Sequence, residues 1–542
     1  MKKAQNGHRR AVPKGGKPKA QRGARADSAP GGGAHFVAML QALGLGADAP
    51  FDDGGEDDLD ALLDDFLVFA ATADSPAGEF QDLLKDLEMA LDEARIDANG
   101  GDAEARRDLQ DFARRVDAAA DKGQMQPVAL IKLGAALRNA GLAASEALRG
   151  ALGKALGGAD ALTQDQVPLP SIRTLFPAAK IRDPFDFYEA AAACLEGFPT
   201  GFRVAMARPL AAEADSTARL AALGFAFHAD EALSCAVLEA FAAPLAARPS
   251  DELVAARLRR IAPWLPPRRR ALAEAAARSM RPAPVQVPAP RQEEELAIYA
   301  STCDGSGTSS LMVTQMRGSR LWMAHLLMKP AGVADVLLRF QMPRAEVDEN
   351  KAKMRRATPG ADVGMPCFVR LLRLALGRNL ASGALPPFRL THICETLGLG
   401  ELAPDLSTTA QIVAQLLVET PGGEDEDALA AAHRAIAGHA LAESWFDADA
   451  AVYSLLTPCK TPKQAKAALM AKYLPGRREF WARQCALCAV ALRDKGGPGR
   501  ETWRHLALIG REIAGEAALE TIPLIGQIAD RSVEAHFAQR MR

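Results

Sequence analysis

Apolar residues recur at helical spacing over most of the chain. Residues 76–158, 187–280 and 367–542 contain stripes in which Leu, Ala and Val return every three or four positions, with charged residues between them. Pairs such as "GG" and "KG" separate the earlier stripes, and several stripes begin with Ser or Asp, which are preferred at helix N-caps. The pattern predicts many short amphipathic helices.

One region has a different pattern. "LAIYAST" (296–302), "SSLMVTQMR" (309–317) and "RLWMAHLLM" (320–328) are short apolar runs with Gly-containing corners between them. Such runs are typical of strands joined in hairpins. The polar residues 343–357 that follow predict a helix.

These patterns predict a mostly α protein with two irregular helical domains, each a bundle or solenoid-like, the second carrying a small antiparallel β meander. "RPAPVQVPAPRQ" marks a boundary, because alternating Pro keeps a chain extended. The predicted divisions are a disordered basic tail (1–34), a helical domain (35–280, with a sub-boundary at 159–186), a Pro-rich linker (281–292), and a domain (293–542) with the β meander (296–328) and a helical bundle.

Consecutive short helices joined by short turns fill residues 187–280. In this respect the segment resembles a HEAT-like α-solenoid. A true array shows a fixed period and a repeated consensus, and neither is found here. An irregular helical bundle therefore remains an alternative.

Composition supports the helical prediction. Apolar residues make up 49% of the 542 residues, enough for sizeable cores, but aromatic residues make up only 5%. That is poor material for a large β protein. The eight cysteines are spread thinly, unlike a secreted disulfide framework, so we expect a reducing cytoplasm. No run of about 18 apolar residues occurs, and we predict no membrane contact.

The net charge of −2 says nothing about partners, but the charges are unevenly placed. Residues 51–66 carry eight Asp or Glu and no basic residue; this block is a solvated helix face or folds back on the basic tail. Residues 1–26 carry nine basic residues and no acidic one. Because Lys and Arg displace counterions from phosphates, this tail is the candidate for nucleic-acid contact. Its basic residues are Lys2, Lys3, Arg9, Arg10, Lys14, Lys17, Lys19, Arg22 and Arg25. Further basic clusters lie at 257–270, 351–356 and 460–478.

The corner "DGSGT" between the first two predicted strands is the candidate cofactor site. About thirty residues here are similar to the opening of the sugar-kinase and actin-like ATPase fold, which implies a loop that holds nucleotide phosphates. The resemblance would place Asp304 on a metal ion and Gly305, Ser306, Gly307 and Thr308 around the phosphate. The long βαβ continuation and second acidic motif of that fold are not found after residue 343. The alternative is that the two glycines allow positive φ in a hairpin corner.

Two other motifs have a structural explanation. Cys485 and Cys488 form a C-x-x-C pair inside an apolar helix, without the second ligand pair that zinc needs. We predict core cysteines. His439 and Glu443 share a helix face, but His433 lies six residues earlier and points elsewhere, so no metal site is expected.

No catalytic set is found, and the sequence leans away from an enzyme. We expect a non-enzymatic, intracellular, helical scaffold or adaptor that binds a protein partner, needs no cofactor and contacts nucleic acid through its tail. The alternative is a nucleotide-binding phosphotransferase or ATPase-like enzyme that uses the DGSGT loop.

Overall fold

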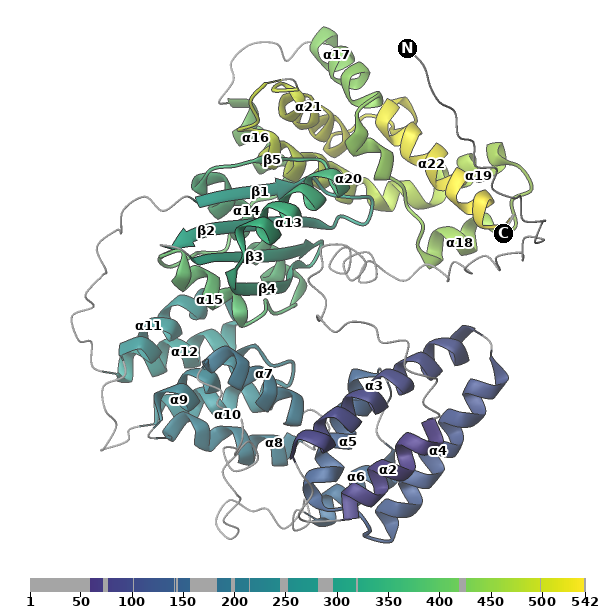
Figure 1. Ribbon diagram of the computed structural model, residues 1–542. Helices are drawn as coiled ribbons and strands as arrows, with labels where there is room; N and C mark the ends of the chain where they lie inside the picture. Colours follow the sequence, from purple (N-terminus) through teal and green to yellow (C-terminus); the bar gives the residue numbers. More distant parts are fainter. Residues whose placement is uncertain are drawn as a thin grey trace, which may run out of the picture.

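The computed structural model describes residues 59–540, with gaps at 72–76, 101, 141, 143–144, 156–182, 196–199, 214, 244–251, 281–295, 318–319, 419–425 and 498. Within these residues the protein is mostly helical and contains a small antiparallel sheet, as the sequence predicts (Figure 1). The predicted disordered tail lies outside the described residues.

The first helical block precedes residue 156. It consists of α2 (Leu59–Ala71), α3 (Ala77–Gly100), α4 (Ala103–Asp121), α5 (Pro127–Asn139) and α6 (Glu146–Ala155). Asp102 caps α4, because its carboxylate accepts hydrogen bonds from the N–H groups of Glu104 and Ala105. The apolar stripes of these helices meet in a core that includes the fully buried Leu63 and Phe66.

The second helical block is made of short helices, several of them single 3₁₀ turns. It consists of α7 (Pro184–Leu195), α8 (Thr200–Ala207), η2 (Arg208–Ala212), α9 (Ser216–Ala222), η3 (Leu223–Phe227), α10 (Glu231–Ala242), α11 (Glu252–Ile261), η4 (Ala262–Trp264) and α12 (Pro267–Ser279). Asp230 caps α10, as the Asp at the start of that predicted stripe indicates, whereas α9 is capped by Asp215, one residue before the Ser216 with which its stripe was predicted to begin.

The sheet has the strand order β4-β3-β2-β1-β5, and every neighbouring pair is antiparallel. Its strands are β1 (Leu296–Ser301), β2 (Ser309–Arg317), β3 (Arg320–Lys329), β4 (Gly332–Met342) and β5 (Gly360–Asp362). The three strands predicted from the sequence are confirmed, as is the helix that follows, α13 (Arg344–Ala357). The sheet is larger than expected, because β4 and β5 join it on opposite edges.

Both faces of the sheet are covered. On one face α13 packs over β3, and Met312, Met323 and Met354 belong to a small core between them. On the other face α14 and α20 pack against the strands, and Leu311 and Leu326 join the main core. Burial on both faces explains why β2 and β3 are continuous apolar runs rather than alternating ones.

The edge strand β4 is partly closed by side chains. The N–H group of Val333 donates to Oδ1 of Asn379 on α14, at 2.8 Å. The N–H group of Val336 donates to Oδ1 of Asp335, at 2.7 Å. These main-chain donors are therefore occupied although no further strand pairs with β4.

The C-terminal block is helical. It consists of α14 (Met365–Ser382), α15 (Arg389–Thr396), α16 (Thr409–Val418), α17 (Glu426–Ala437), η5 (Ala440–Ser444), α18 (Ala450–Leu456), α19 (Pro462–Ala468), the π-helical turn η6 (Leu469–Tyr473), α20 (Leu474–Leu492), α21 (Thr502–Ala514), η7 (Leu519–Thr521) and α22 (Pro523–Arg540). Pro366 stands in the first turn of α14, and Gly383 ends that helix with φ of 76°.

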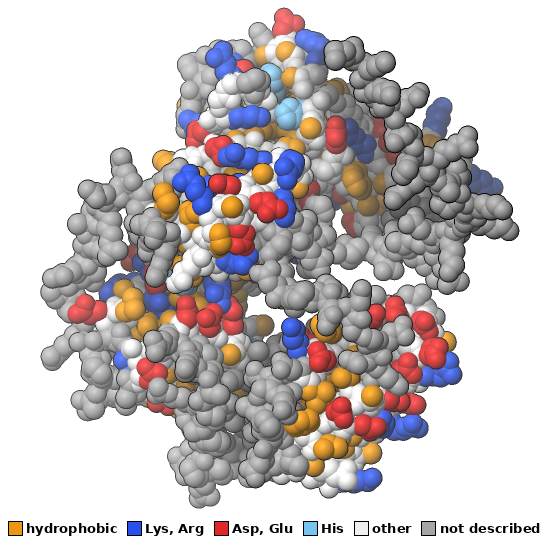
Figure 2. Space-filling model, viewed as in Figure 1, with side chains coloured by type: hydrophobic (Ala, Val, Ile, Leu, Met, Phe, Trp, Pro, Cys, Tyr) orange, Lys and Arg blue, Asp and Glu red, His pale blue; other side chains and the backbone are white. Residues whose placement is uncertain are grey.

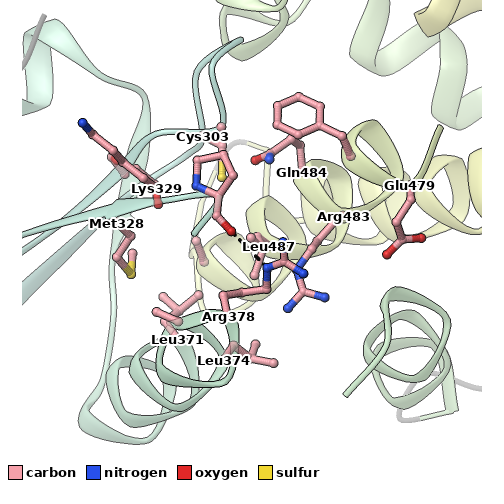
Figure 3. A pocket seen from close by; sticks show the side chains of 17 residues that line it. Cys303, Met328, Lys329, Leu371, Leu374, Arg378, Glu479, Arg483, Gln484 and Leu487 are labelled. Carbon is pink, nitrogen blue, oxygen red and sulfur yellow. Dashed lines mark hydrogen bonds between the residues drawn. The ribbon is translucent and has the colours of Figure 1, made fainter. Parts of the chain in front are cut away.

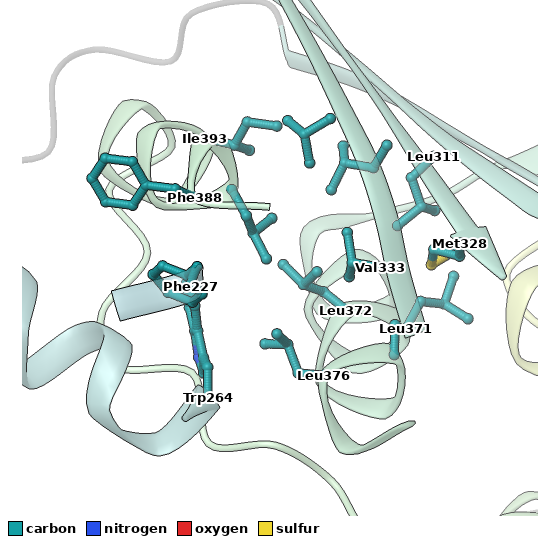
Figure 4. Close-up of a cluster of buried hydrophobic side chains, with 14 of the residues drawn as sticks. Phe227, Trp264, Leu311, Met328, Val333, Leu371, Leu372, Leu376, Phe388 and Ile393 are labelled. Atoms are coloured by element: carbon teal, nitrogen blue, oxygen red, sulfur yellow. The ribbon is translucent and has the colours of Figure 1, made fainter. Parts of the chain in front are cut away.

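The second helical block packs against the C-terminal half, a contact that the sequence did not predict. Figure 4 shows Phe227 and Trp264 of the second block facing Phe388 and Ile393 of the C-terminal half. The indole Nε1 of Trp264 donates to the carbonyl oxygen of Leu402 at 2.9 Å. We call this contact the seam.

Polar contacts reinforce the seam. Arg257 donates from Nε and Nη2 to the two carboxylate oxygens of Glu395, at 2.6 and 2.8 Å, and Arg260 donates to the same carboxylate at 3.1 Å. Arg389 makes similar contacts to Asp186 and Glu189. The seam therefore combines an apolar centre with bidentate ion pairs.

Candidate ligand cavity

A cavity of about 250 Å³ lies between one end of the sheet and the helices α14 and α20 (Figure 3). The sheet contributes the corner between β1 and β2, which includes Cys303 and Gly307, and the turn after β3, which includes Pro330. The two helices contribute the rest of the wall. The residues that form it therefore come from segments as far apart in the sequence as Ser301 and Ala491.

Two arginines lie side by side in the wall. Figure 3 shows the guanidinium groups of Arg378 on α14 and Arg483 on α20 close together, whereas the Lys329 side chain points away from them. Nε of Arg378 donates to the carbonyl oxygen of Pro330 at 3.0 Å. Among the described residues, no carboxylate lies within 4.0 Å of either guanidinium. Two positive groups thus face one cavity, whose carboxylate, Glu479, forms a direct ion pair with neither of them.

Arg483 is the more deeply buried of these arginines. Only 9% of its surface is exposed, and its Nε is buried without a hydrogen-bond partner among the described residues. Nη1 reaches the carbonyl oxygen of Ser407 at 3.4 Å, a long hydrogen bond. Burial, and then repulsion from Arg378, lower the pKa of the Arg483 guanidinium from its ordinary value, although the nearby carboxylates of Glu479 and Asp405 partly oppose this. A buried, incompletely paired arginine is unfavourable unless something compensates its charge.

A contrast lies two turns earlier on α20. There Arg477 donates from Nε and Nη2 to the buried carboxylate of Asp447, at 3.1 and 2.9 Å. Nε1 of Trp481 donates to the other oxygen of the same carboxylate at 3.1 Å. This cluster is paired internally, and Arg483 is not.

The remaining polar groups of the wall are partly engaged. Glu479 lines the cavity and accepts a hydrogen bond from Oγ1 of Thr409 at 2.5 Å. Gln484 is 3% exposed, and its Oε1 has no partner among the described residues. The opposite wall is apolar and is formed by Met328, Leu371, Leu374, Ala375, Leu487 and Ala491.

The DGSGT corner borders the cavity at Gly307. Oδ1 of Asp304 accepts hydrogen bonds from the N–H groups of Ser306 and Thr308, both at 2.9 Å, and from the Ser306 hydroxyl at 2.6 Å. Gly307 has φ of 79°, the conformation that glycine allows in a hairpin corner. Gly305 lies against the carbonyl oxygens of Ser444 and Phe446. Two N–H groups of the loop are therefore used by its own carboxylate; phosphate binding by the loop stays a prediction.

The C-x-x-C cysteines are buried in α20, in agreement with the prediction of core cysteines. The N–H group of Cys303 donates to Sγ of Cys488 at 3.2 Å. The neighbouring Cys488 thiol and burial raise the pKa of the Cys303 thiol well above its ordinary value. Cys303 is therefore a poor nucleophile even though it lines the cavity.

The histidines flagged by the sequence are separated. His433 contacts the carboxylate of Glu512 through Nε2 at 2.7 Å, and Nδ1 of His439 accepts a hydrogen bond from the N–H group of Leu441. Within the described part of the chain, no cluster of three metal-ligating side chains is found.

The basic clusters outside the tail mostly serve internal contacts. Beside the seam arginines, Arg269 donates to the carbonyl oxygens of Ala226 and His228, and Arg478 donates to three carbonyl oxygens at and just beyond the C-terminal end of α21. The acidic block also has an internal partner, because Arg115 of α4 pairs with Asp60 and Asp64. The nine basic residues of the tail lie outside the described residues.

The fold defines a protein of consecutive helical blocks with a small antiparallel sheet between the second and the last. Among the described helices, none is long and apolar enough to cross a membrane.

Three domain families match the chain in order. Residues 60–145 match the family described as "Uncharacterised protein y4lR N-terminal domain", residues 199–283 match "Y4lR second domain", and residues 410–537 match "Y4lR C-terminal helical domain". No curated protein and no solved structure matches the chain. The matches agree with the helical character of all three segments. They do not confirm the specific resemblance of residues 187–280 to HEAT-like repeats, which stays a prediction.

Sequence reasoning found the loop beside the cavity but not its arginines. Arg378 and Arg483 each lie in an apolar helical stripe, "RLLRLALGRNLAS" and "FWARQCALCAVAL". A basic residue within such a stripe is a usable signal, because charged residues are almost never fully buried unless they are paired. The sequence does not show that the two arginines meet.

Proposed function

We propose that this chain is a non-enzymatic binding protein whose cavity holds a small anion between Arg378 and Arg483. The observation that carries the proposal is the pair of guanidinium groups that share one cavity, of which the buried Arg483 has an Nε atom without a hydrogen-bond partner among the described residues. An anion there would accept hydrogen bonds from both side chains, and charge-assisted hydrogen bonds of this kind are stronger than neutral ones.

The wall offers little for catalysis, which supports binding over chemistry. Cys303 is held as a thiol by its raised pKa, and Glu479 is engaged by Thr409. Neither is arranged as a nucleophile beside a base. We therefore prefer a ligand-binding role to the phosphotransferase alternative.

A test follows from two opposite effects expected of replacing Arg483: the ligand-free protein should become more stable, and anion binding should be lost. Replacing a buried, incompletely paired arginine with an apolar side chain of similar length relieves an electrostatic penalty. We expect Arg483→Met to raise the free energy of unfolding of the ligand-free protein by about 1–3 kcal/mol, measured by urea titration. The same variant should lose the rise in melting temperature that millimolar phosphate or hexanoate gives the wild type, since only a ligand of the native state stabilises it.

The control is Arg500→Met, which removes an exposed arginine outside the cavity. It should keep both the wild-type stability and the anion-induced shift. A destabilised Arg483→Met protein, or an anion response that survives the substitution, would show that Arg483 is structural and not a ligand-binding residue.

We also propose that the helical blocks carry a protein partner, as an adaptor does. Figure 2 shows hydrophobic side chains gathered on the visible face of the first block, and the exposed side chains Val68 and Met89 belong to α2 and α3. Exposed apolar patches of this kind often mark interaction sites. Nucleic-acid contact through the basic tail remains part of this proposal.

A further inference from the structure

We infer that the anion held by the cavity is a short-chain aliphatic monocarboxylate, whose carboxylate lies at the two arginines and whose alkyl chain lies on the apolar wall. This inference rests on the proposed function and names its ligand class. It follows from the unequal ends of the cavity, its single negative wall residue and its size.

The cavity has a charged end and an apolar end. Arg378 and Arg483 form the charged end, and Figure 3 shows Leu371 and Leu374 lying beside them on the α14 side. Met328 of β3 extends the same apolar wall. A ligand that satisfies both ends must join an anionic group to a hydrocarbon part, because apolar wall atoms gain most from contact with apolar ligand atoms.

The charged residues at the polar end of the cavity suit a ligand with one negative charge better than a ligand with two. Glu479 lines the same cavity, and its carboxylate repels a second negative charge on the ligand. The DGSGT loop does not supply a free set of N–H donors for phosphate oxygens, because Asp304 accepts those of Ser306 and Thr308. A planar carboxylate can instead accept paired hydrogen bonds from a guanidinium group.

A nucleotide does not fit these surroundings. The aromatic residue of the wall, Phe480, is covered by Arg477, whose guanidinium carbon lies 3.5 Å from the ring centroid. Trp481 packs edge-on against Phe480, with 5.1 Å between the two ring centroids. The ring is therefore poorly available for stacking against a base.

The volume of the cavity limits the length of the ligand's alkyl chain. About 250 Å³ lies just below the range of roughly 300–1,000 Å³ that is usual for drug-sized ligands. A water molecule occupies about 30 Å³ of liquid, so the cavity has room for about eight groups of that size. A methylene group is of comparable size, and hexanoate, with its six carbons and two oxygens, is the matching probe.

The test is isothermal titration of the full chain with acetate, butanoate, hexanoate and decanoate at pH 7. Each added methylene should strengthen binding by about fourfold up to hexanoate, and the gain should stop when the cavity is full. Hexylamine, which has the same chain and the opposite charge, should not bind. Arg378→Gln should weaken hexanoate binding at least tenfold while leaving the fold intact, since Arg378 is the more exposed of the two arginines.

A second variant tests the apolar wall. Ala375→Leu narrows the cavity and should move the best ligand from hexanoate towards butanoate. Should this variant fail to fold, the chain-length series on the wild type still decides the question.

Titrations with inorganic phosphate and Mg-ATP distinguish a failure of the monocarboxylate inference from a failure of the proposed anion-binding function. If phosphate or ATP binds in a manner that depends on Arg483, and the carboxylates show no dependence on chain length, the anion cavity stands and the monocarboxylate inference is wrong. If no anion gives a response that Arg483→Met removes, the proposed function itself fails.

Discussion

Gly307 illustrates how closely a single residue can be fixed at the edge of the cavity. Its φ of 79° is a conformation that residues with a side chain rarely adopt. A Cβ atom at this position would also lie 2.6 Å from Nε2 of Gln484 and 2.9 Å from Cγ of Pro330. Both the backbone and the surroundings therefore require glycine.

The corresponding prediction compares two glycines. Gly307→Ala should lower the free energy of unfolding by about 2–5 kcal/mol, because the left-handed backbone strain of about 1–2 kcal/mol is added to overpacking of about 1–3 kcal/mol. Gly383→Ala is the matched control, because Gly383 has a similar φ of 76° but no atom within 4 Å of an added Cβ. In Gly383→Ala the free energy of unfolding should fall only by the backbone strain of about 1–2 kcal/mol. Equal losses by urea unfolding would show that crowding at Gly307 is unimportant.

At this scale the sequence predicted a hairpin corner at Asp304–Thr308, and the positive φ of Gly307 fits that interpretation. It did not predict Arg378 or Arg483 as site residues. The reason is physical: each arginine is one charge among the apolar residues of its helix, and its role depends on a partner about 100 positions away. Only the packing of α14 against α20 brings the two together.

Among the elements, β3 carries a buried titratable group within the sheet, between β2 and β4. His325 is paired in register with Met312 on β2 and Leu337 on β4, and its side chain is 1% exposed. Burial lowers the pKa of the imidazole to about 4, because the charged form is poorly solvated there. The folded sheet therefore favours the neutral imidazole.

This burial predicts a pH dependence of stability. In the unfolded chain the imidazole titrates near its ordinary pKa of about 6.5, so below that pH the unfolded state binds more protons than the folded state. The contribution is fully present above pH 6.5 and is lost progressively as the pH falls to about 4, by about 3 kcal/mol in total. Urea titrations from pH 7 to pH 4 should show this loss in the wild type and a smaller loss in His325→Leu. If the free energy of unfolding fell equally with pH in the wild type and in His325→Leu, the prediction would be contradicted.

The strands also show where element prediction succeeded and failed. β1, β2 and β3 were predicted because they are apolar runs between Gly-containing corners. β4 was not, because "GVADVLLRFQM" mixes exposed polar residues into its apolar pattern, as an edge strand does. β5 has three residues, too few for any periodicity to be detected.

At the scale of the whole molecule, the seam joins segments on the two sides of the Pro-rich region. The predicted divide at 281–292 concerns chain connectivity, whereas the seam depends on complementary residues that are far apart in sequence. Arg257 and Glu395 are separated by 138 positions. Nothing local in either segment identifies the other as its partner, and so the contact was beyond sequence reasoning.

Glu395→Gln tests the importance of the seam. The substitution keeps the shape of the side chain but leaves Arg257, which is 5% exposed, without its anion. Removing one partner of a buried ion pair is expected to lower the free energy of unfolding by about 3 kcal/mol. Hydrogen exchange should quicken in α11 and α15 together. Glu274→Gln, which alters an exposed pair at 3.7 Å, should change neither quantity. Faster exchange in only one of the two helices would argue against a coupled seam.

The partly closed edge of β4 has a consequence for how copies of this chain meet. An open edge invites a strand from a neighbouring molecule, and repeated addition of this kind leads to fibrils. Here an incoming strand would find the donors of Val333 and Val336 already taken by Asn379 and Asp335. Asn379 lies on the same helix as Arg378, one position further on. Helix α14, which forms part of the cavity wall, thus also hinders the pairing of this sheet edge with a strand of another copy.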